Sequence, residues 1–194
     1  IPKIDPYLEI WHFPISLYLF LGGMAAGIIF FASLFTILKR EKDVQTAIKP
    51  AMIIVLFALS IGLLALFYDL THKLYVWRLY TTIRLESPMS WGAWVLLLIT
   101  IGSFLWVFSY FTELFPKWNL KIKWLQQLEL YLIKNRRNLA IILLPLSLIL
   151  GIYTGILLSA FNARPLWNNA ILGPLFLVSG LSTGAACIIL FLKD

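Results

Sequence analysis

The stretch "EIWHFPISLYLFLGGMAAGIIFF", residues 9–31, decides the fold class of this chain. After a charged residue and Trp-His-Phe-Pro, it continues as an apolar run long enough to cross the ~30 Å hydrocarbon core of a bilayer. Hydrophobic residues make up 61% of the 194 residues and charged residues only 13%. Soluble domains have about twice that share of charge, roughly 25%. The chain is therefore predicted to be a membrane protein.

Apolar runs of spanning length recur along the chain. Unpaired backbone groups are not tolerated in lipid, so each run is predicted to form a helix. The first run lacks a basic leader and an A-x-A-like cleavage site, which favours a true span over a signal peptide. We therefore expect one all-α polytopic bundle with five spans, at residues 14–38, 51–70, 91–115, 139–161 and 170–192.

The connections between these runs predict the orientation. Most of the 16 Lys and Arg residues lie in the connections after the first and third runs. By the positive-inside rule those connections are cytoplasmic and the N-terminus is extracytoplasmic. The net charge of +7 then needs no nucleic acid to explain it. Residues 117–138 mix Leu, Ile and Trp with Lys and Gln, which favours an amphipathic helix on the cytoplasmic interface; a solvated loop is the alternative.

Two glycine motifs suggest an internal repeat. "LFLGGMAAG" (19–27) and "LFLVSGLSTG" (175–184) each place Leu-Phe-Leu before two glycines four residues apart. A true repeat has a unit of four helices, which predicts a 4+4 bundle with three further helices outside this sequence; chance is the alternative, because such motifs are common in membrane helices. The fourth run also carries small residues at a spacing of four, which predicts close helix packing: Ser147, Gly151, Gly155 and Ser159.

Polar residues gather at the predicted outer mouth. Asp69 and His72 close the second span and are three residues apart, so they share a helical face. A structural ion pair of Asp69 with Lys73 or Arg164 is the alternative. Ionisable groups in a membrane are costly and invite a functional hypothesis, whereas Glu113, alone at the other end, is expected to reach water. The first and fourth spans bring further polar or aromatic residues to this mouth: Trp11, His12, Tyr18, Tyr153, Asn162 and Arg164.

Such a cluster suits a quinone. The two quinone carbonyls need hydrogen-bond donors, and reduction takes up two protons, which tyrosine, histidine and aspartate can supply or carry. Haem is the competitor, but a bis-histidine haem needs two imidazoles at one depth. The chain has only His12 and His72, so two haems are excluded and one at the outer interface is the remaining alternative. The single cysteine, Cys187, cannot ligate an iron–sulfur cluster, and no metal site is predicted.

Four stretches carry a family resemblance: "LYLFLGGMAAG", "SPMSWGAW", "YTGILLSAFNARPLWN" and "LFLVSGLSTGAA". Together they resemble the NrfD-type family, the membrane subunits of polysulfide reductase and related respiratory complexes. The resemblance implies a subunit of the bacterial inner membrane without haem or metal that binds menaquinone or ubiquinone near the outer face. It also implies electron exchange with a ferredoxin-like iron–sulfur subunit, which serves a catalytic subunit, either a molybdopterin enzyme or a multihaem cytochrome.

At the level of residues, the resemblance points to His12, Tyr18 and Tyr153 for quinone binding. Asp69 matches the family's acidic residue at the end of the second helix, and with His72 it is expected to transfer protons. Many members follow that aspartate with Leu-Gly-Arg-Pro, where this chain has Leu-Thr-His-Lys. Trp11, Asn162 and Arg164 complete the expected quinone site.

The connection between the second and third spans, rich in Tyr, Trp and Arg, is either an interfacial aromatic belt or the docking surface for the iron–sulfur subunit. Two other functions stay open. One is an ion-translocating subunit in which Asp69, His72 and Glu113 form part of a proton route, and the other is a passive membrane anchor.

Overall fold

The computed structural model describes residues 13–70, 72–81, 88–114, 123–159 and 169–192, without the side chains of Lys42, Asp69, Leu79 and Pro88. Within these ranges the chain is helical and forms no strand. Five of the helices are long and apolar enough to cross a membrane. The expectation of an all-α polytopic membrane protein with five spans is therefore confirmed.

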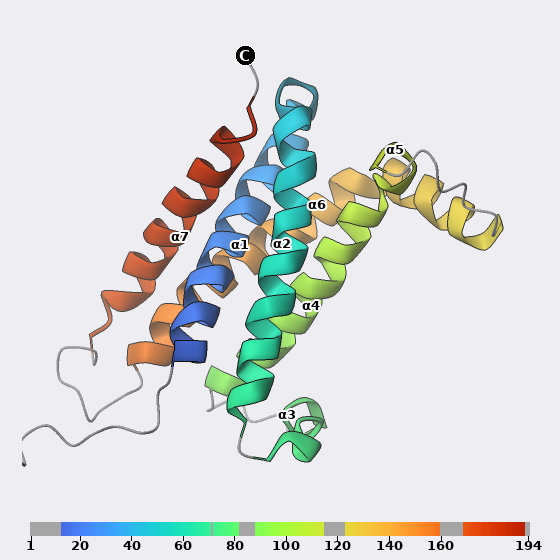
Figure 1. Ribbon diagram of the computed structural model, residues 1–194. Coiled ribbons are helices and arrows are strands. Elements are labelled where there is room, and N and C mark those ends of the chain that lie inside the picture. The colour runs from blue at the N-terminus through green and yellow to red at the C-terminus, as the bar shows by residue number, and fades with distance from the viewer. Residues whose placement is uncertain (1–12, 71, 82–87, 115–122, 160–168, 193–194) are drawn as a thin grey trace, which may run out of the picture.

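The long helices form a bundle around α1 (Figure 1). α1 packs against α2, α6 and α7, while α4 packs against α2 and α6. The long helices are α1 (Phe13–Ile37), α2 (Glu41–Asp69), α4 (Pro88–Phe108), α6 (Lys123–Ser159) and α7 (Leu172–Ile189), and the short ones are η1 (Lys73–Tyr75), α3 (Arg78–Thr81) and α5 (Phe111–Leu114).

The bundle has two ends, named here after the short helices that mark them. At the α3 end, α1, α4 and α7 begin while α2 and α6 finish; at the α5 end, α1, α4 and α7 finish and α2 begins (Figure 1). α1 and α7 therefore run parallel. All described ion pairs lie at the α5 end.

The two glycine motifs pack against each other. A Cβ added at Gly27 would lie 2.1 Å from the Gly180 carbonyl oxygen, and one at Gly184 would lie 2.4 Å from the Gly27 carbonyl carbon. No side chain fits at either position, so only glycine allows α1 and α7 to approach this closely. The similar motifs therefore serve one parallel helix contact.

The small-residue face of α6 meets the first two turns of α7. A Cβ at Gly155 would lie 2.3 Å from the Leu172 carbonyl oxygen, and one at Gly151 would lie 2.8 Å from the Leu177 side chain. Ser147 is buried and donates to the Leu144 carbonyl of its own helix, 2.7 Å away. Close packing, as expected from the spacing of four, is what this face provides.

The amphipathic segment before the fourth span is helical from Lys123, but it is no separate helix. It runs without a break into the span, and α6 is 37 residues long as a result. Its first turns leave the bundle sideways instead of following the axes of α1 and α2 (Figure 1). At the junction, residues 134–140, the good helix formers Lys, Arg, Leu and Ala outnumber two asparagines, which explains why no break occurs there.

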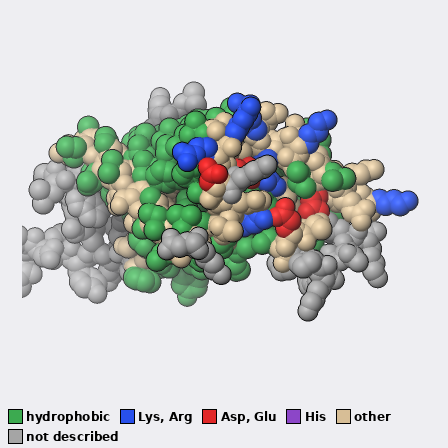
Figure 2. Space-filling model, turned by 90° about the horizontal axis from the view of Figure 1, so that it is seen from above, with side chains coloured by type: hydrophobic (Ala, Val, Ile, Leu, Met, Phe, Trp, Pro, Cys, Tyr) green, Lys and Arg blue, Asp and Glu red, His purple; other side chains and the backbone are tan. Residues whose placement is uncertain are grey.

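Paired charges hold the α5 end together (Figure 2). Glu41 on α2 accepts hydrogen bonds from the Arg136 guanidinium of α6, at 2.7 Å, and from the Tyr110 hydroxyl. Arg136 also donates to the side chain and carbonyl of Ser109, at 3.1 Å each. Burial and the Glu41 bond raise the pKa of Tyr110, so its phenol stays protonated at neutral pH and donates.

The expectation that Glu113 stands alone at this end is wrong. Its carboxylate pairs with the Lys49 ammonium of α2. Lys49 lies 64 residues away in sequence, and α2 begins well before its apolar run, so the polar first turns of α2 bring this lysine beside α5. The pair compensates both charges, and the Glu113 side chain is still half exposed.

Candidate functional site

Tyr18 of α1 and Tyr153 of α6 come together inside the α3 end. Each side chain is only 4% exposed, and the two helices that carry them pack against each other. Tyr18 lies in the second turn of α1, and Tyr153 lies in the second turn from the end of α6. The two helices thus bring residues far apart in the sequence to one end of the bundle.

Glycines on the facing helices make room for these two rings. A Cβ at Gly92 of α4 would lie 2.1 Å from Cζ and 2.6 Å from the hydroxyl oxygen of Tyr153. A Cβ at Gly62 of α2 would lie 3.3 Å from Cδ2 of Tyr18. Trp91 completes the cluster, with its ring edge-on to Tyr153 at a centroid distance of 5.4 Å. Gly92 in particular allows the Tyr153 ring to lie directly against the α4 backbone.

His72 does not join this pair. It is exposed after the end of α2, and its ring centroid lies 6.3 Å from that of Tyr75 in η1. Two cations that follow His72 in the sequence lie on aromatic faces nearby. Lys73 is 4.5 Å from the centroid of Tyr68, and Arg78 is 4.6 Å from that of Tyr75. The structure therefore gives this segment an exposed surface of cations and aromatic rings.

The remaining predicted site residues have no described side chains. His12, Trp11, Asn162 and Arg164 lie outside the described residues, and Asp69 is described only as the last residue of α2. Their proposed roles therefore stay predictions. Among the described residues, no three His, Cys, Asp or Glu side chains are grouped so as to bind a metal ion.

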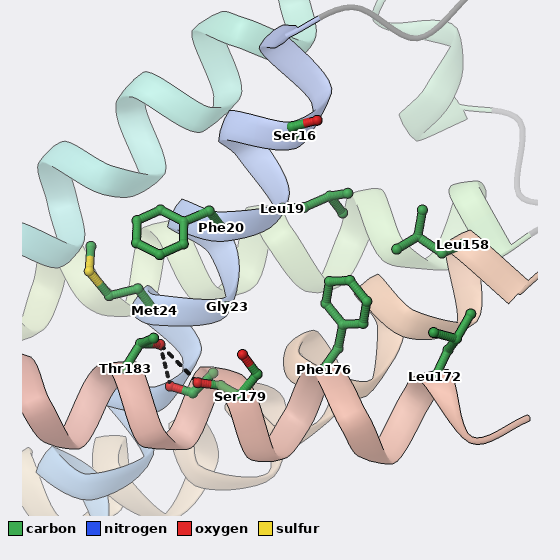
Figure 3. Close-up of a pocket in the computed structure, with 11 residues that line it drawn as sticks. Ser16, Leu19, Phe20, Gly23, Met24, Leu158, Leu172, Phe176, Ser179 and Thr183 are labelled. Atoms are coloured by element: carbon green, nitrogen blue, oxygen red, sulfur yellow. Dashed lines mark hydrogen bonds between the residues drawn. The ribbon is translucent and has the colours of Figure 1, made fainter. Parts of the chain in front are cut away.

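An apolar groove of about 460 Å³ lies between α1 and α7 at the same end (Figure 3). Phe20 and Met24 of α1 and Phe176 of α7 line it, together with Gly23 and Gly180. Thr183 offers little polarity, because its hydroxyl already bonds the carbonyls of Ser179 and Gly180. The groove is suited to an apolar chain.

Two leucines that line the groove lie close in sequence to the tyrosine pair. Leu19 follows Tyr18 directly, and Leu158 lies little more than one turn after Tyr153. The tyrosines face α2 and α4, while the groove faces α7. The buried tyrosines and the groove thus lie at the same end of the bundle but on different faces of α1.

Sequence reasoning missed the residues that organise the α5 end. Glu41 lies on α2, Tyr110 in the turn between α4 and α5, and Arg136 on α6, and they are separated by as many as 95 residues in sequence. The available signal was the scarcity of acidic residues, nine in the whole chain. A carboxylate near the start of a mostly apolar helix needs a cation from elsewhere, and that alone could have prompted a search for its partner.

Comparison with known proteins identifies the family. The family model described as "Polysulphide reductase, NrfD" matches residues 4–193, nearly the whole chain. The chain belongs to the NrfD family. Protein NrfD of Escherichia coli (strain K12) is 34% identical to this family member across 91% of this chain and 58% of its own length.

Two further relatives agree with this placement. A relative from Wolinella succinogenes, by name one of the chains of polysulfide reductase, is 34% identical across 90% of this sequence and 56% of its own length. An NrfD homologue of Haemophilus influenzae is 29% identical across 99% of this sequence and 61% of its own length. This NrfD-family protein therefore spans little more than half the length of the curated relatives that it matches.

Proposed function

We propose that this NrfD-family chain is the quinone-reactive membrane subunit of a respiratory oxidoreductase. The observation that carries the proposal is the buried pair of Tyr18 and Tyr153, framed by Gly62 and Gly92 at one end of the bundle. The relative from Wolinella belongs by name to a polysulfide reductase, which supports membership in such a complex.

The chemistry of the pair fits a quinone head group. A phenol O–H donates to a carbonyl oxygen and carries no charge at neutral pH, so two buried tyrosines can hold a neutral ligand without an ion in the membrane. His12, Trp11, Asn162 and Arg164 complete the proposed site. In the direction of quinol oxidation, the ligand gives up two protons, and Asp69 and His72 are proposed to carry them to the surface.

The groove between α1 and α7 supplies a place for the isoprenoid tail. Its walls are mostly apolar, and it lies at the same end of the bundle as the tyrosine pair. An isoprenoid chain needs van der Waals contact and no hydrogen bonds. Menaquinone and ubiquinone both meet this requirement.

The cation-and-aromatic surface of η1 and α3 is the proposed docking site for a ferredoxin-like iron–sulfur subunit. Lys73 and Arg78 are exposed there together with Leu74 and Trp77. A surface of this kind complements an acidic partner, since aromatic anchors and arginine are enriched in protein interfaces. The partner would in turn serve a molybdopterin or multihaem catalytic subunit outside the cytoplasm, with the chain in the inner membrane and its N-terminus extracytoplasmic.

The deciding experiment measures quinol oxidation by the assembled complex carrying Tyr18→Phe or Tyr153→Phe. Loss of one hydrogen bond of about 1 kcal/mol is expected to raise the KM for quinol roughly fivefold in each variant. Tyr131→Phe is the matched control, because Tyr131 is an exposed tyrosine of the same helix as Tyr153. Wild-type kinetics in both site variants would rule out the pair as the head-group site.

A passive anchor makes a different prediction for the purified protein. A quinone-site inhibitor should bind the wild-type protein and should bind the Tyr18→Phe variant more weakly, as measured by protection against thermal unfolding. An anchor without a site gives no protection in either protein.

One observation favours proton translocation as a second candidate function. Ser33 and Ser103 are fully buried, and neither hydroxyl has a hydrogen-bond partner within the described ranges. They lie in the last two turns of α1 and α4, close to the charged α5 end. Buried unpaired hydroxyls are places where internal water binds, and a water chain there could carry protons inward from Glu41.

Counting the protons that the complex moves in proteoliposomes distinguishes proton translocation from quinol oxidation alone. A pumping subunit moves more protons than quinol chemistry releases, and Ser33→Ala with Ser103→Ala should abolish the surplus while quinol oxidation continues. Ser147→Ala is the control, because the hydroxyl of Ser147 already bonds a backbone carbonyl. Proton release that equals the quinol stoichiometry in the wild type would exclude the second candidate.

A further inference from the structure

The first turns of α6, residues 123–138, form a structure that the quinone chemistry does not use; they are named here the α6 arm. The arm leaves the bundle sideways at the α5 end (Figure 1). Because α1 and α2 run along the direction in which the chain crosses the membrane, a segment running sideways from their ends lies along the membrane surface. The arm thus lies at the depth of the lipid headgroups.

The charged side chains of the arm divide between an inward side, which faces the bundle, and an exposed outward side. Its one acidic residue, Glu129, is only 6% exposed and accepts hydrogen bonds from the backbone N–H and the hydroxyl of Thr112, at 2.8 and 2.6 Å. Arg136 also turns inward, to Glu41. The outward side keeps no acidic residue.

Three cations remain on the outward side: Lys123, Lys134 and Arg137. In the described part of the chain, none of them is in salt-bridge contact with a carboxylate. Spacings of eleven and three residues place them on one helical face. That face therefore has a single sign of charge.

Apolar and aromatic side chains are exposed beside these cations. Leu130 is 67% exposed between Lys123 and Lys134, and Trp124 and Tyr131 are exposed along one edge of the same face. Tryptophan and tyrosine are characteristic of the boundary between headgroups and hydrocarbon. A helix that faced only water would not gather them on its outward side.

The same face continues into the membrane. Ile141 lies seven residues after Lys134, which is two turns along the same face, and it is half exposed on the spanning part of α6. The cations are therefore the last residues of a face that meets hydrocarbon further along. This continuity favours lipid over a soluble acidic protein as the partner.

We propose that the α6 arm binds anionic phospholipid of the leaflet at the α5 end, with Lys134 and Arg137 holding the phosphate. Arg137 offers a planar fork of donors to phosphate oxygens, and Lys134 adds a compact charge one turn away. Leu130 and Trp124 enter the upper acyl region and orient the arm. The quinone site at the opposite end plays no part in this contact.

The test is lipid titration of the purified full-length protein in detergent, with bound lipid counted by native mass spectrometry. The wild type should bind phosphatidylglycerol more tightly than phosphatidylcholine, and this preference should shrink at high salt. Because each cation near an anionic surface is worth about 1 kcal/mol, Lys134→Gln with Arg137→Gln should weaken phosphatidylglycerol binding about 30-fold.

Two matched variants make the result specific. Lys134→Arg with Arg137→Lys keeps both charges and should bind phosphatidylglycerol as the wild type does. Lys73→Gln with Arg78→Gln removes two cations from the α3 end and should leave the arm's affinity unchanged. Equal loss in both Gln pairs, unchanged affinity in the arm pair, or a wild type that binds the two lipids equally at every salt concentration would each overturn the proposal.

Discussion

The two ends of the bundle use polar residues in opposite ways. At the α5 end, carboxylates and cations pair between α2 and α5 and between α2 and α6. At the α3 end, the buried polar residues are two neutral tyrosines held by glycine and tryptophan contacts. No ion pair occurs at the α3 end among the described side chains.

The comparison shows that the two ends differ in the free energy needed to bury their polar groups. A buried ion pair needs nearly complete hydrogen bonding to repay its desolvation, and the Arg136–Glu41 pair receives it from Tyr110 and Ser109. A neutral phenol costs much less to bury, so the α3 end can hold polar groups without ion pairs. Under the proposed function, stability and ligand recognition are separated by the length of the helices.

The largest expected effect is that of Arg136→Ala at the α5 end. Arg136 and Glu41 are 12% and 20% exposed at their side chains, so removing the arginine leaves a mostly buried carboxylate without its cation. Loss of about 3 kcal/mol of unfolding free energy is expected, measured by denaturation in mixed micelles. Arg137→Ala is the control, since truncating this exposed neighbour should cost less than about 0.5 kcal/mol. Similar losses for the two arginines would show that the buried network does not hold this end.

Gly92→Ala tests the α3 end by steric means. The added methyl would lie 2.1 Å from the Tyr153 ring, so the ring has to move, at a cost of about 2 kcal/mol from overpacking. Gly62→Ala meets Tyr18 only at 3.3 Å and should cost little, because alanine also favours the helix. Thermal unfolding and quinol KM should both change for Gly92→Ala. Equal behaviour of the two variants would show that Gly92 does not set the position of Tyr153.

The sequence predicts the membrane class and much of this difference. Apolar runs predict the helices because a helix pairs its own backbone groups in lipid, and the family resemblance points to Tyr18 and Tyr153 together. The glycine motifs suggest a repeat, and nothing in the sequence says that Gly27 packs against Gly180. A local sequence pattern is therefore sufficient to predict a helix wherever the surroundings are uniformly apolar.

The contacts at the α5 end could not be predicted in this way. Lys49 meets Glu113 only because polar residues extend α2 beyond its apolar run, and the length of that extension depends on tertiary contacts. Arg136 was one of several basic residues in a cytoplasmic-looking loop. Nothing local distinguishes the inward Arg136 from the outward Arg137 until the register of α6 against α2 and α4 is known.

Glu129→Gln should have an intermediate effect. The amide keeps one oxygen for Thr112 but turns a donor toward the other Thr112 group, so one charge-assisted bond is lost, at about 1 kcal/mol. Thr112→Val removes the hydroxyl alone, and the double variant gives the coupling between the two residues. Strictly additive losses would mean that Glu129 and Thr112 do not act on each other.

The smallest effect is expected for Lys49→Gln. Its partner Glu113 is half exposed, and a pair that water reaches is worth about 0.5 kcal/mol or less. A double-mutant cycle with Glu113→Gln should give a coupling of that size, and added salt should reduce it further. The Arg136–Glu41 coupling should resist salt, because its charges are largely withdrawn from solvent. If the Lys49 pair proved as strong and as insensitive to salt as the Arg136 pair, exposure would not govern the strength of ion pairs at this end, and the distinction between a buried clamp and a peripheral contact would fail.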